Sequence, residues 1–168
     1  GRTRDPLVEW LDTLADGVVV VLDPGATFAG LAEPLRDRVL ARTDVWTGNA
    51  DEAAALTGVR GMREAAEVVA TLLAPDAVTI VRDGARGCAV RESGRTTHCP
   101  GHPQRPVDTN GAGDTHTGVL LAERATGASC PEAAARANTA GAIKVTRRGP
   151  DTAPTRAEID AFLAALPR

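Results

Sequence analysis

The chain has 168 residues, 43% of them hydrophobic, with a formal net charge of −3 and no tyrosine. This is enough for one sizeable apolar core. Nucleic-acid surfaces usually carry a basic stripe with stacking aromatic side chains, and this sequence has neither, so no nucleic-acid partner is expected. The longest apolar run, residues 18–22, is far shorter than the ~20 residues of a membrane span, so no membrane partner is expected either.

Cysteine usage and the first residues indicate a cellular compartment. Cys88, Cys99 and Cys130 are odd in number and lack CxxC spacing, which favours reduced thiols and a cytoplasmic location. The first residues contain no apolar region of the kind found in signal peptides. A helix-like segment begins at once, without a Met or a strand before it, which suggests part of a longer chain.

Apolar periodicity and turn residues predict the elements in chain order. A helix is expected at residues 6–14, a strand buried on both faces at 18–22, a helix at 32–41 and a strand at 44–47. Asn49 can cap the next helix, which should end at Gly58. Then come a helix at 63–73, a strand at 77–81, a hairpin of 87–91 and 95–98 turning at Ser93-Gly94, and helices at 112–126, 131–145 and 155–165.

This order of strands and helices predicts one α/β domain over residues 1–168, with a mostly parallel sheet and helices on both faces. Such sheets bind ligands at the carboxyl ends of their strands.

The most informative segment is DTNGAGD, residues 108–114, directly before a predicted helix. Its glycines allow a tight turn, and the unpaired N–H groups of the following helix would form an anion hole suited to a phosphoryl group. Asp114 lies beside that hole, where a carboxylate could accept a proton from an attacking hydroxyl. The alternative is an ordinary acidic residue favoured by the helix dipole.

This segment is similar to the second signature of the ribokinase-like (PfkB) carbohydrate kinases, DTxGAGD. Four further segments resemble motifs of that family in the same order. They are LDP at 22–24, NADE at 49–52, TIVRDGARG at 79–87, and VTRRG at 145–149 after a helix containing Asn138.

The resemblance implies a ribokinase-like, Rossmann-like three-layer fold and ATP-dependent phosphoryl transfer to a hydroxyl of a sugar or sugar-like substrate. It also implies a role for each matching residue. Asp114 would be the catalytic base, beside an anion hole made by the N–H groups of Ala112, Gly113 and Asp114, and Gly111 would be a further catalytic residue of this turn. Asn49 and Glu52 would organise Mg²⁺ and phosphates; Arg82, Gly84, Arg86, Gly87 and Gly113 would line the nucleotide, with Asn138 near the adenine. Asp108, Asn110 and backbone oxygens of Lys144, Arg147 and Gly149 would surround a monovalent cation such as K⁺.

The sequence departs from the family pattern at several places. Arg82 stands where Thr is usual, and could reach phosphates or disturb the adenine pocket. His116 stands where Phe is common, and a packing role is favoured over a catalytic one. Complete members also carry an N-terminal half with the sugar-binding residues and a lid, which this chain lacks. The alternative hypothesis is therefore a truncated, non-catalytic nucleotide-binding module. In the chain as given, the strand at 18–22 would lose a neighbour and expose an apolar edge, so homo-oligomers are expected.

A weaker pattern combines His98, Cys99, His102 and Cys88 as candidate zinc ligands. Structural zinc sites usually show paired ligands at regular spacing, so a solvent-exposed loop is the favoured interpretation. No GKS or GKT follows the glycines, so a P-loop is not expected.

Overall fold

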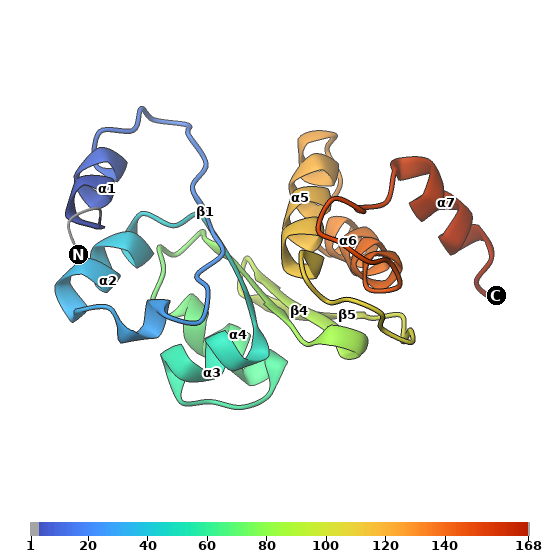
Figure 1. The fold of residues 1–168 in the computed structure, drawn as a ribbon. Coiled ribbons are helices and arrows are strands. Elements are labelled where there is room, and N and C mark those ends of the chain that lie inside the picture. Colours follow the sequence, from blue (N-terminus) through green and yellow to red (C-terminus); the bar gives the residue numbers. More distant parts are fainter. Residues whose placement is uncertain (1–3, 168) are drawn as a thin grey trace. The chain divides into compact units, whose positions relative to one another are not determined.

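The computed structural model describes residues 4–167, and side chains from residue 6 onward. It divides the chain into two compact units (Figure 1). Unit 1 runs up to residue 82 and includes residues 91–96; unit 2 comprises residues 83–90 and the chain from 97 onward. The expectation of a single domain therefore stays a prediction.

Unit 1 contains three strands, β1 (Val21–Leu22), β2 (Val45–Asn49) and β3 (Val78–Arg82). β2 lies between the other two and pairs with each of them in parallel, with Val45 opposite both Val21 and Val78. Most of β3 is buried, as expected of a parallel strand covered on both faces. The predicted parallel sheet is thus confirmed at these strands.

Strand β1 is shorter than the sequence predicts. The expected strand at 18–22 was to be buried on both faces, but Val18 is 44% exposed and Val19 63% exposed. Only Val21 and Leu22 join the ladder. Among the strands that the structure describes, β1 stands at the end of the sheet order and pairs only with β2.

The helices of unit 1 are α1 (Arg4–Leu11), α2 (Glu33–Ala41), α3 (Ala50–Thr57) and α4 (Met62–Ala70), with a short 3₁₀ turn η1 (Phe28–Gly30). α3 and α4 pack against each other, and α4 packs along β3. Asn49 caps α3 and Gly58 ends it in the left-handed conformation at φ 74°, both as predicted.

Trp46 on β2 is fully buried. Its indole ring lies across the strand so closely that a Cβ on Gly48 would be 2.4 Å from the ring. Residue 48 must therefore be glycine for the ring to occupy this place.

Strands β4 (Gly87–Glu92) and β5 (Arg95–Pro100) form the predicted hairpin. Ser93 and Gly94 both have positive φ, 47° and 80°, which is the geometry of a two-residue type I′ turn. In the sheet the strands follow the order β1-β2-β3-β4-β5, so the sheet is mixed: parallel at first, then antiparallel in the hairpin.

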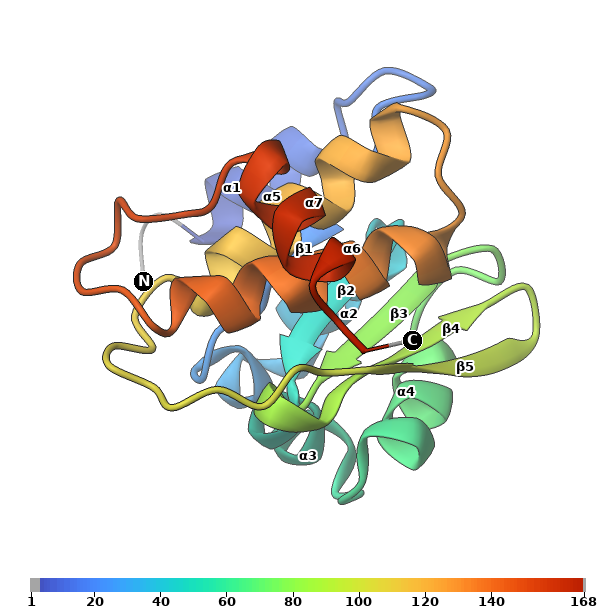
Figure 2. The ribbon, with the colours of Figure 1, turned by 90° about the vertical axis from the view of Figure 1, so that its right-hand side faces the viewer.

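Unit 2 contains a 3₁₀ turn η2 (Gly84–Arg86) and three helices, α5 (Ala112–Ala125), α6 (Cys130–Lys144) and α7 (Arg156–Ala164). α5 packs along α6, and α7 lies against α6 on another side (Figures 1 and 2). A cluster of Ala140, Ile143 and Ile159 joins α6 to α7. All three helices lie within one residue of their predicted bounds.

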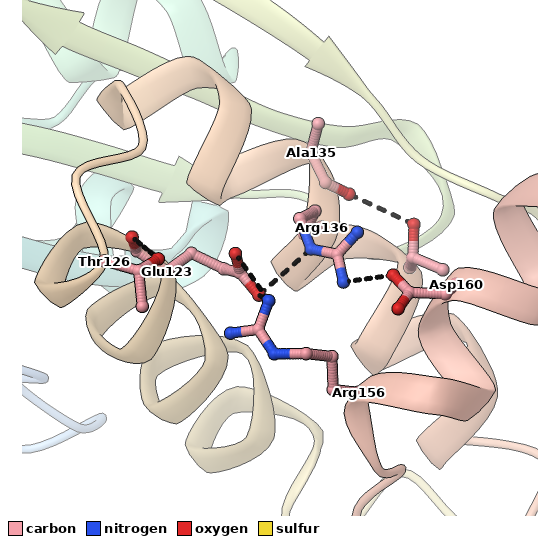
Figure 3. Close-up of polar contacts among 7 residues, drawn as sticks. Glu123, Thr126, Ala135, Arg136, Arg156 and Asp160 are labelled. Atoms are coloured by element: carbon pink, nitrogen blue, oxygen red, sulfur yellow. Dashed lines mark hydrogen bonds and ion pairs between the residues drawn. The ribbon is translucent and has the colours of Figure 1, made fainter.

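A polar network also connects these three helices (Figure 3). The Glu123 carboxylate, with 8% of its side chain exposed, pairs with Arg136 at 3.0 Å and with Arg156 at 2.9 Å. Arg136 also reaches Asp160 at 2.6 Å. Because Glu123 is on α5, Arg136 on α6 and the other two on α7, these ion pairs hold the helices in register.

Among the described residues, no helix combines the length and the apolar character that crossing a membrane requires.

Candidate functional site

The glycine-rich segment forms the entry to α5. Gly111 precedes the helix at φ 76°, a left-handed conformation that glycine adopts without strain, and no side chain caps the helix. The Ala112 N–H donates to the Thr109 carbonyl at 3.2 Å. The next N–H groups, of Gly113 and Asp114, lie in the first helical turn, where no earlier turn supplies acceptors. An anion could be bound there.

Asp114 lies in the first turn of α5 and its residue is exposed. Its carboxylate is therefore at the same helix end as the first-turn N–H groups. This placement suits a proton acceptor for a bound hydroxyl, and it also suits the helix dipole.

The Asp108 side chain connects the glycine-rich segment, residues 108–114, to the turn that follows α6. One carboxylate oxygen accepts the Asn110 N–H at 3.0 Å and the other accepts the Gly149 N–H at 3.0 Å. These hydrogen bonds lower the pKa of Asp108, and the charges of Lys144 and Arg148 act in the same direction. Asp108 is therefore held as an anion that fixes the geometry of the loop.

Backbone carbonyls in and before the turn after α6 accept hydrogen bonds from the turn itself and from residues 107 and 108. The Val145 carbonyl accepts the N–H groups of Val107 and Asp108, at 2.7 and 3.1 Å. The Lys144 carbonyl accepts the Arg147 N–H at 3.0 Å, and the Gly149 carbonyl accepts the Thr152 hydroxyl at 2.9 Å. The predicted cation residues are thereby brought into one region of unit 2: Asp108, Asn110, Lys144, Arg147 and Gly149.

The burial of the Lys144 side chain is a feature that the sequence reasoning missed, because it excluded Lys144 as a P-loop lysine and otherwise considered only its backbone oxygen. Lys144 is fully buried, and its Nζ has no hydrogen-bond partner among the described residues. A Cβ on Gly111 would lie 3.6 Å from Lys144 Cε, so the lysine reaches the glycine-rich loop. Lys144 is the single lysine in a chain whose other side-chain cations are arginines, but the sequence alone does not show that its side chain is buried.

The predicted nucleotide loop is a compact turn in unit 2. Gly84 and Gly87 both have positive φ, 53° and 93°, and the Asp83 N–H donates to the Gly87 carbonyl at 2.7 Å. Arg86 pairs with Asp83 at 2.6 Å and has 73% of its side chain exposed. A Cβ on Gly87 would be 2.1 Å from the Cys99 carbonyl, so only glycine fits.

Asn138 was expected near the adenine, and its amide is engaged within unit 2. It donates to the carbonyls of Cys99 and Pro100, at 2.9 and 3.2 Å, and its oxygen contacts the His116 ring at 3.2 Å. Both residues are buried. Asn138 thus fixes the end of β5 to α6, and His116 packs inside, as the favoured interpretation had it; contact of Asn138 with adenine stays a prediction.

Three of the expected phosphate and metal residues lie in unit 1, at or just after the carboxyl ends of its parallel strands. Asn49 and Glu52 form a reciprocal capping box at the start of α3: the Glu52 N–H donates to the Asn49 oxygen at 2.9 Å, and the Asn49 N–H donates to the Glu52 carboxylate at 2.8 Å. Arg82, at the end of β3, donates to Asp23 at 2.9 Å and to the Thr47 carbonyl at 3.3 Å. Arg82 is therefore tied to the loop after β1.

The expected exposed loop is only partly present at the candidate zinc residues: His98 is exposed and His102 lies outside helices and strands, but the two cysteines are buried. Residues 95–100 are strand β5, and Cys88 and Cys99 are buried thiols. A hydrogen bond with Cys99 and burial raise the pKa of Cys88. His102 packs edge-on against Phe162, with ring centroids 5.3 Å apart. No group of three or more His, Cys, Asp or Glu side chains within the described part of the chain could hold a metal ion.

Comparisons with known proteins give a consistent result. The sequence profile of the family described as pfkB family carbohydrate kinase matches residues 9–156. A ribokinase from Haemophilus influenzae is 34% identical over 152 residues, which cover 88% of this chain and 48% of the relative. The chain thus spans about half the length of that curated relative.

Solved structures of ribokinases have the same fold as this chain over about half of their length. A ribokinase from Thermotoga maritima superposes with a TM-score of 0.79 at 26% identity, covering 96% of this chain and 53% of that one. A candidate ribokinase II from E. coli, determined in complex with ATP and Mg²⁺, gives a TM-score of 0.75 at 30% identity, covering 89% of this chain and 49% of that one.

Proposed function

Because the chain belongs to the pfkB family of carbohydrate kinases, we propose that the protein containing it transfers the γ-phosphoryl group of ATP to a hydroxyl of a sugar or sugar-like substrate. The observation that carries this proposal is the start of α5, where the first-turn N–H groups and the exposed Asp114 carboxylate share one helix end. The alternative, a non-catalytic nucleotide-binding module, is not favoured by any relative described above.

The proposed chemistry needs little beyond positioning and charge neutralisation, as phosphoryl transfer generally does. The N–H groups of Gly113 and Asp114 would bind oxygens of the transferred group. Asp114 would accept the proton of the attacking hydroxyl. Gly111 contributes the left-handed bend that turns the chain into the helix, and Asp108 holds the loop before it.

Asn49 and Glu52 fit a role beside Mg²⁺, because both offer oxygen atoms, the ligand type that this cation prefers. Their capping box occupies the Asn49 side-chain oxygen and one Glu52 oxygen. The family resemblance implies that their contact with Mg²⁺ runs through water. Bound Mg²⁺ would neutralise phosphate charge in the reaction. Arg82, Gly84, Arg86, Gly87 and Asn138 are proposed as nucleotide residues on the strength of the family resemblance.

The decisive experiment replaces Asp114 by asparagine in the protein completed by the N-terminal half that its relatives possess. Removal of a general base typically lowers the rate by ~10²–10⁴-fold. We expect a loss of kcat in that range with ATP affinity retained, since the amide keeps the shape of the helix end. A coupled ADP-release assay over a panel of pentoses and hexoses, with calorimetry for ATP, measures both quantities.

Asp37→Asn is the matched control, because Asp37 is an exposed helical acid on α2, in the other unit from Asp114. Its kcat should equal that of the unchanged protein. A kcat near that of the unchanged protein for Asp114→Asn would remove this residue from the mechanism.

The 168-residue chain by itself is expected to bind ATP weakly and to phosphorylate sugars poorly. Exclusion of water strengthens electrostatic interactions at a reacting centre, and in the family the N-terminal half supplies the sugar pocket and the lid. Calorimetry with ATP and the same sugar panel test this expectation. Robust sugar-dependent turnover by the chain alone would place its substrate site within these residues.

A further inference from the structure

His98 is an exposed residue of β5 whose ring bonds to the nucleotide loop, the turn at residues 83–87. Its Nε2 atom lies 3.0 Å from the Arg86 carbonyl oxygen. Arg86 is the last residue of η2, within that turn, and His98 and the turn both belong to unit 2. The imidazole therefore reaches from a strand to the loop that is proposed to bind ATP.

The acceptor decides which ring nitrogen of His98 carries a proton. A backbone carbonyl oxygen can only accept, so Nε2 must be the donor in this contact with Arg86. The neutral Nε2–H tautomer and the imidazolium ion both meet this requirement. A ring protonated at Nδ1 alone does not meet it.

The hydrogen bond holds one peptide group of the nucleotide loop. The Arg86 carbonyl and the Gly87 N–H belong to the same planar group. The N–H donates to the Gly84 carbonyl, and the carbonyl oxygen accepts from His98. Rotation of this plane, which would reshape the turn, is therefore opposed at both of its ends.

The end of β5 gives the turn a firm support. A Cβ on Gly101 would lie 2.5 Å from the Ala85 carbonyl oxygen, so the chain just after β5 lies directly against the turn. Asn138 donates to the carbonyls of residues 99 and 100, which ties this end of the strand to α6. Residues 84–86 themselves are exposed, so a ligand can reach them.

We propose that His98 is a positioning residue for nucleotide binding, whose imidazole holds the turn at residues 83–87 in the shape that receives ATP. The proposal rests on the proposed function, because it takes this turn to be the one that contacts the nucleotide. A loop that is already ordered loses less conformational entropy when a ligand binds. Loss of the imidazole should therefore weaken ATP binding and leave the chemical step as it is.

The test measures the Kd for ATP by calorimetry, and kcat at saturating ATP, in the protein completed by the N-terminal half. His98→Phe keeps a ring and removes the donor, and it should raise this Kd by about 3- to 10-fold, the effect of one hydrogen bond, with kcat unchanged. His98→Gln offers an amide N–H at a similar reach and should restore most of the affinity. Because His98 is exposed, both variants should melt close to the unchanged protein.

Thr97→Ala is the matched control, because neighbouring side chains of a strand point to opposite faces of the sheet. Its Kd for ATP should equal that of the unchanged protein. Nitrogen NMR of the unchanged protein adds a measurement that needs no variant: the proton of the His98 ring should be found on Nε2.

Equal ATP affinity in the unchanged protein and in folded His98→Phe would overturn the proposal, and so would a His98→Gln variant that binds ATP no better than His98→Phe. A ring protonated at Nδ1 alone would remove the hydrogen bond itself, whatever the variants do. Absent ATP binding by the unchanged protein is a different outcome, because it would refute the kinase assignment on which the role of His98 rests.

Discussion

Val19, just before β1, has 63% of its surface exposed, whereas Lys144, at the end of α6, has none exposed. Apolar residues are usually inside and lysines almost never fully buried, so the usual distribution is reversed at both positions. At Val19 the exposure goes with the position at the end of the sheet, since β2 is the one strand that pairs with β1 in the described part of the chain. At Lys144 the side chain is enclosed at the end of α6 beside the glycine-rich loop, since a Cβ on Gly111 would lie 3.6 Å from Lys144 Cε.

The comparison shows that unit 2 buries charged side chains, whereas unit 1 exposes apolar ones. Unit 2 encloses charged side chains, namely Lys144 and the Glu123 carboxylate of the ion-pair network (Figure 3). Unit 1 leaves apolar surface open to pairing at the edge of its sheet. Stability measurements should therefore be sensitive to charge in unit 2, and association measurements to apolar surface in unit 1.

The largest effect on stability is expected from Glu123→Ala. It leaves Arg136 and Arg156 without their shared, mostly buried carboxylate. Removing one partner of a buried ion pair typically lowers the free energy of unfolding by about 3–5 kcal/mol. Because both arginines are partly exposed, we expect a loss of about 3 kcal/mol or somewhat less. Urea unfolding measures the free energy.

Arg156→Ala is the matched variant, since the Arg136–Glu123 pair remains and more than half of the Arg156 side chain is exposed. It should cost under about 1 kcal/mol. Equal losses for the two substitutions would contradict the idea that unit 2 depends on the buried carboxylate.

A smaller, pH-dependent effect is expected at Glu158 on α7. The Arg147 guanidinium, with help from Thr155, lowers the pKa of Glu158 from its ordinary 4.5 to about 2. Because the pKa of Glu158 is lower in the folded state than in the unfolded state, its ionised carboxylate stabilises the fold. This stabilisation is complete above pH 4.5 and is lost as the pH falls towards 2.

Glu158→Gln should therefore melt at a lower temperature than the unchanged protein at neutral pH, and the two melting temperatures should converge as the pH approaches 2. Thermal melts at a series of pH values test this. A constant difference across the series would show that the carboxylate does not carry the effect.

The smallest effect on stability, but a clear one on association, is expected from Val19→Lys. A charge at an exposed strand edge opposes pairing with other chains, while surface substitutions usually change stability by no more than about 0.5 kcal/mol. Sedimentation velocity of the 168-residue chain over a range of concentrations should show less self-association.

Leu72→Lys provides the comparison, because Leu72 is 42% exposed and follows α4, away from the edge strand in sequence. It should leave association unchanged. If both variants associate as the unchanged chain does, the β1 edge is not the contact.

Helix caps and turns that depend on neighbouring residues were predicted well from the sequence. The Asn49 cap, the Gly58 stop and the Ser93-Gly94 turn depend on neighbouring residues alone, and all three were predicted correctly. The β1 strand was predicted too long, because its length depends on which strand lies beside it, a property that the apolar run at residues 18–22 does not contain.

In the site, the backbone around Gly111 was predictable from its glycines, whereas the side-chain partners were not. That Arg82 reaches Asp23, 59 residues earlier, and that Asn138 holds the β5 carbonyls are consequences of long-range folding. The buried side chain of Lys144 was missed for the same reason: the resemblance assigned a role to its carbonyl, and burial appears only once α6 and the loop come together.

The close fit of Trp46 over Gly48 provides an optical reporter within the fold. The chain has no tyrosine and two tryptophans, and Trp10 is 56% exposed while Trp46 is fully buried. In Trp10→Phe the intrinsic fluorescence would come from Trp46 alone, which should emit at short wavelength and resist quenching by iodide. Because Trp46 precedes Thr47, whose carbonyl receives Arg82, changes in that emission on adding ATP would report on the carboxyl ends of the strands.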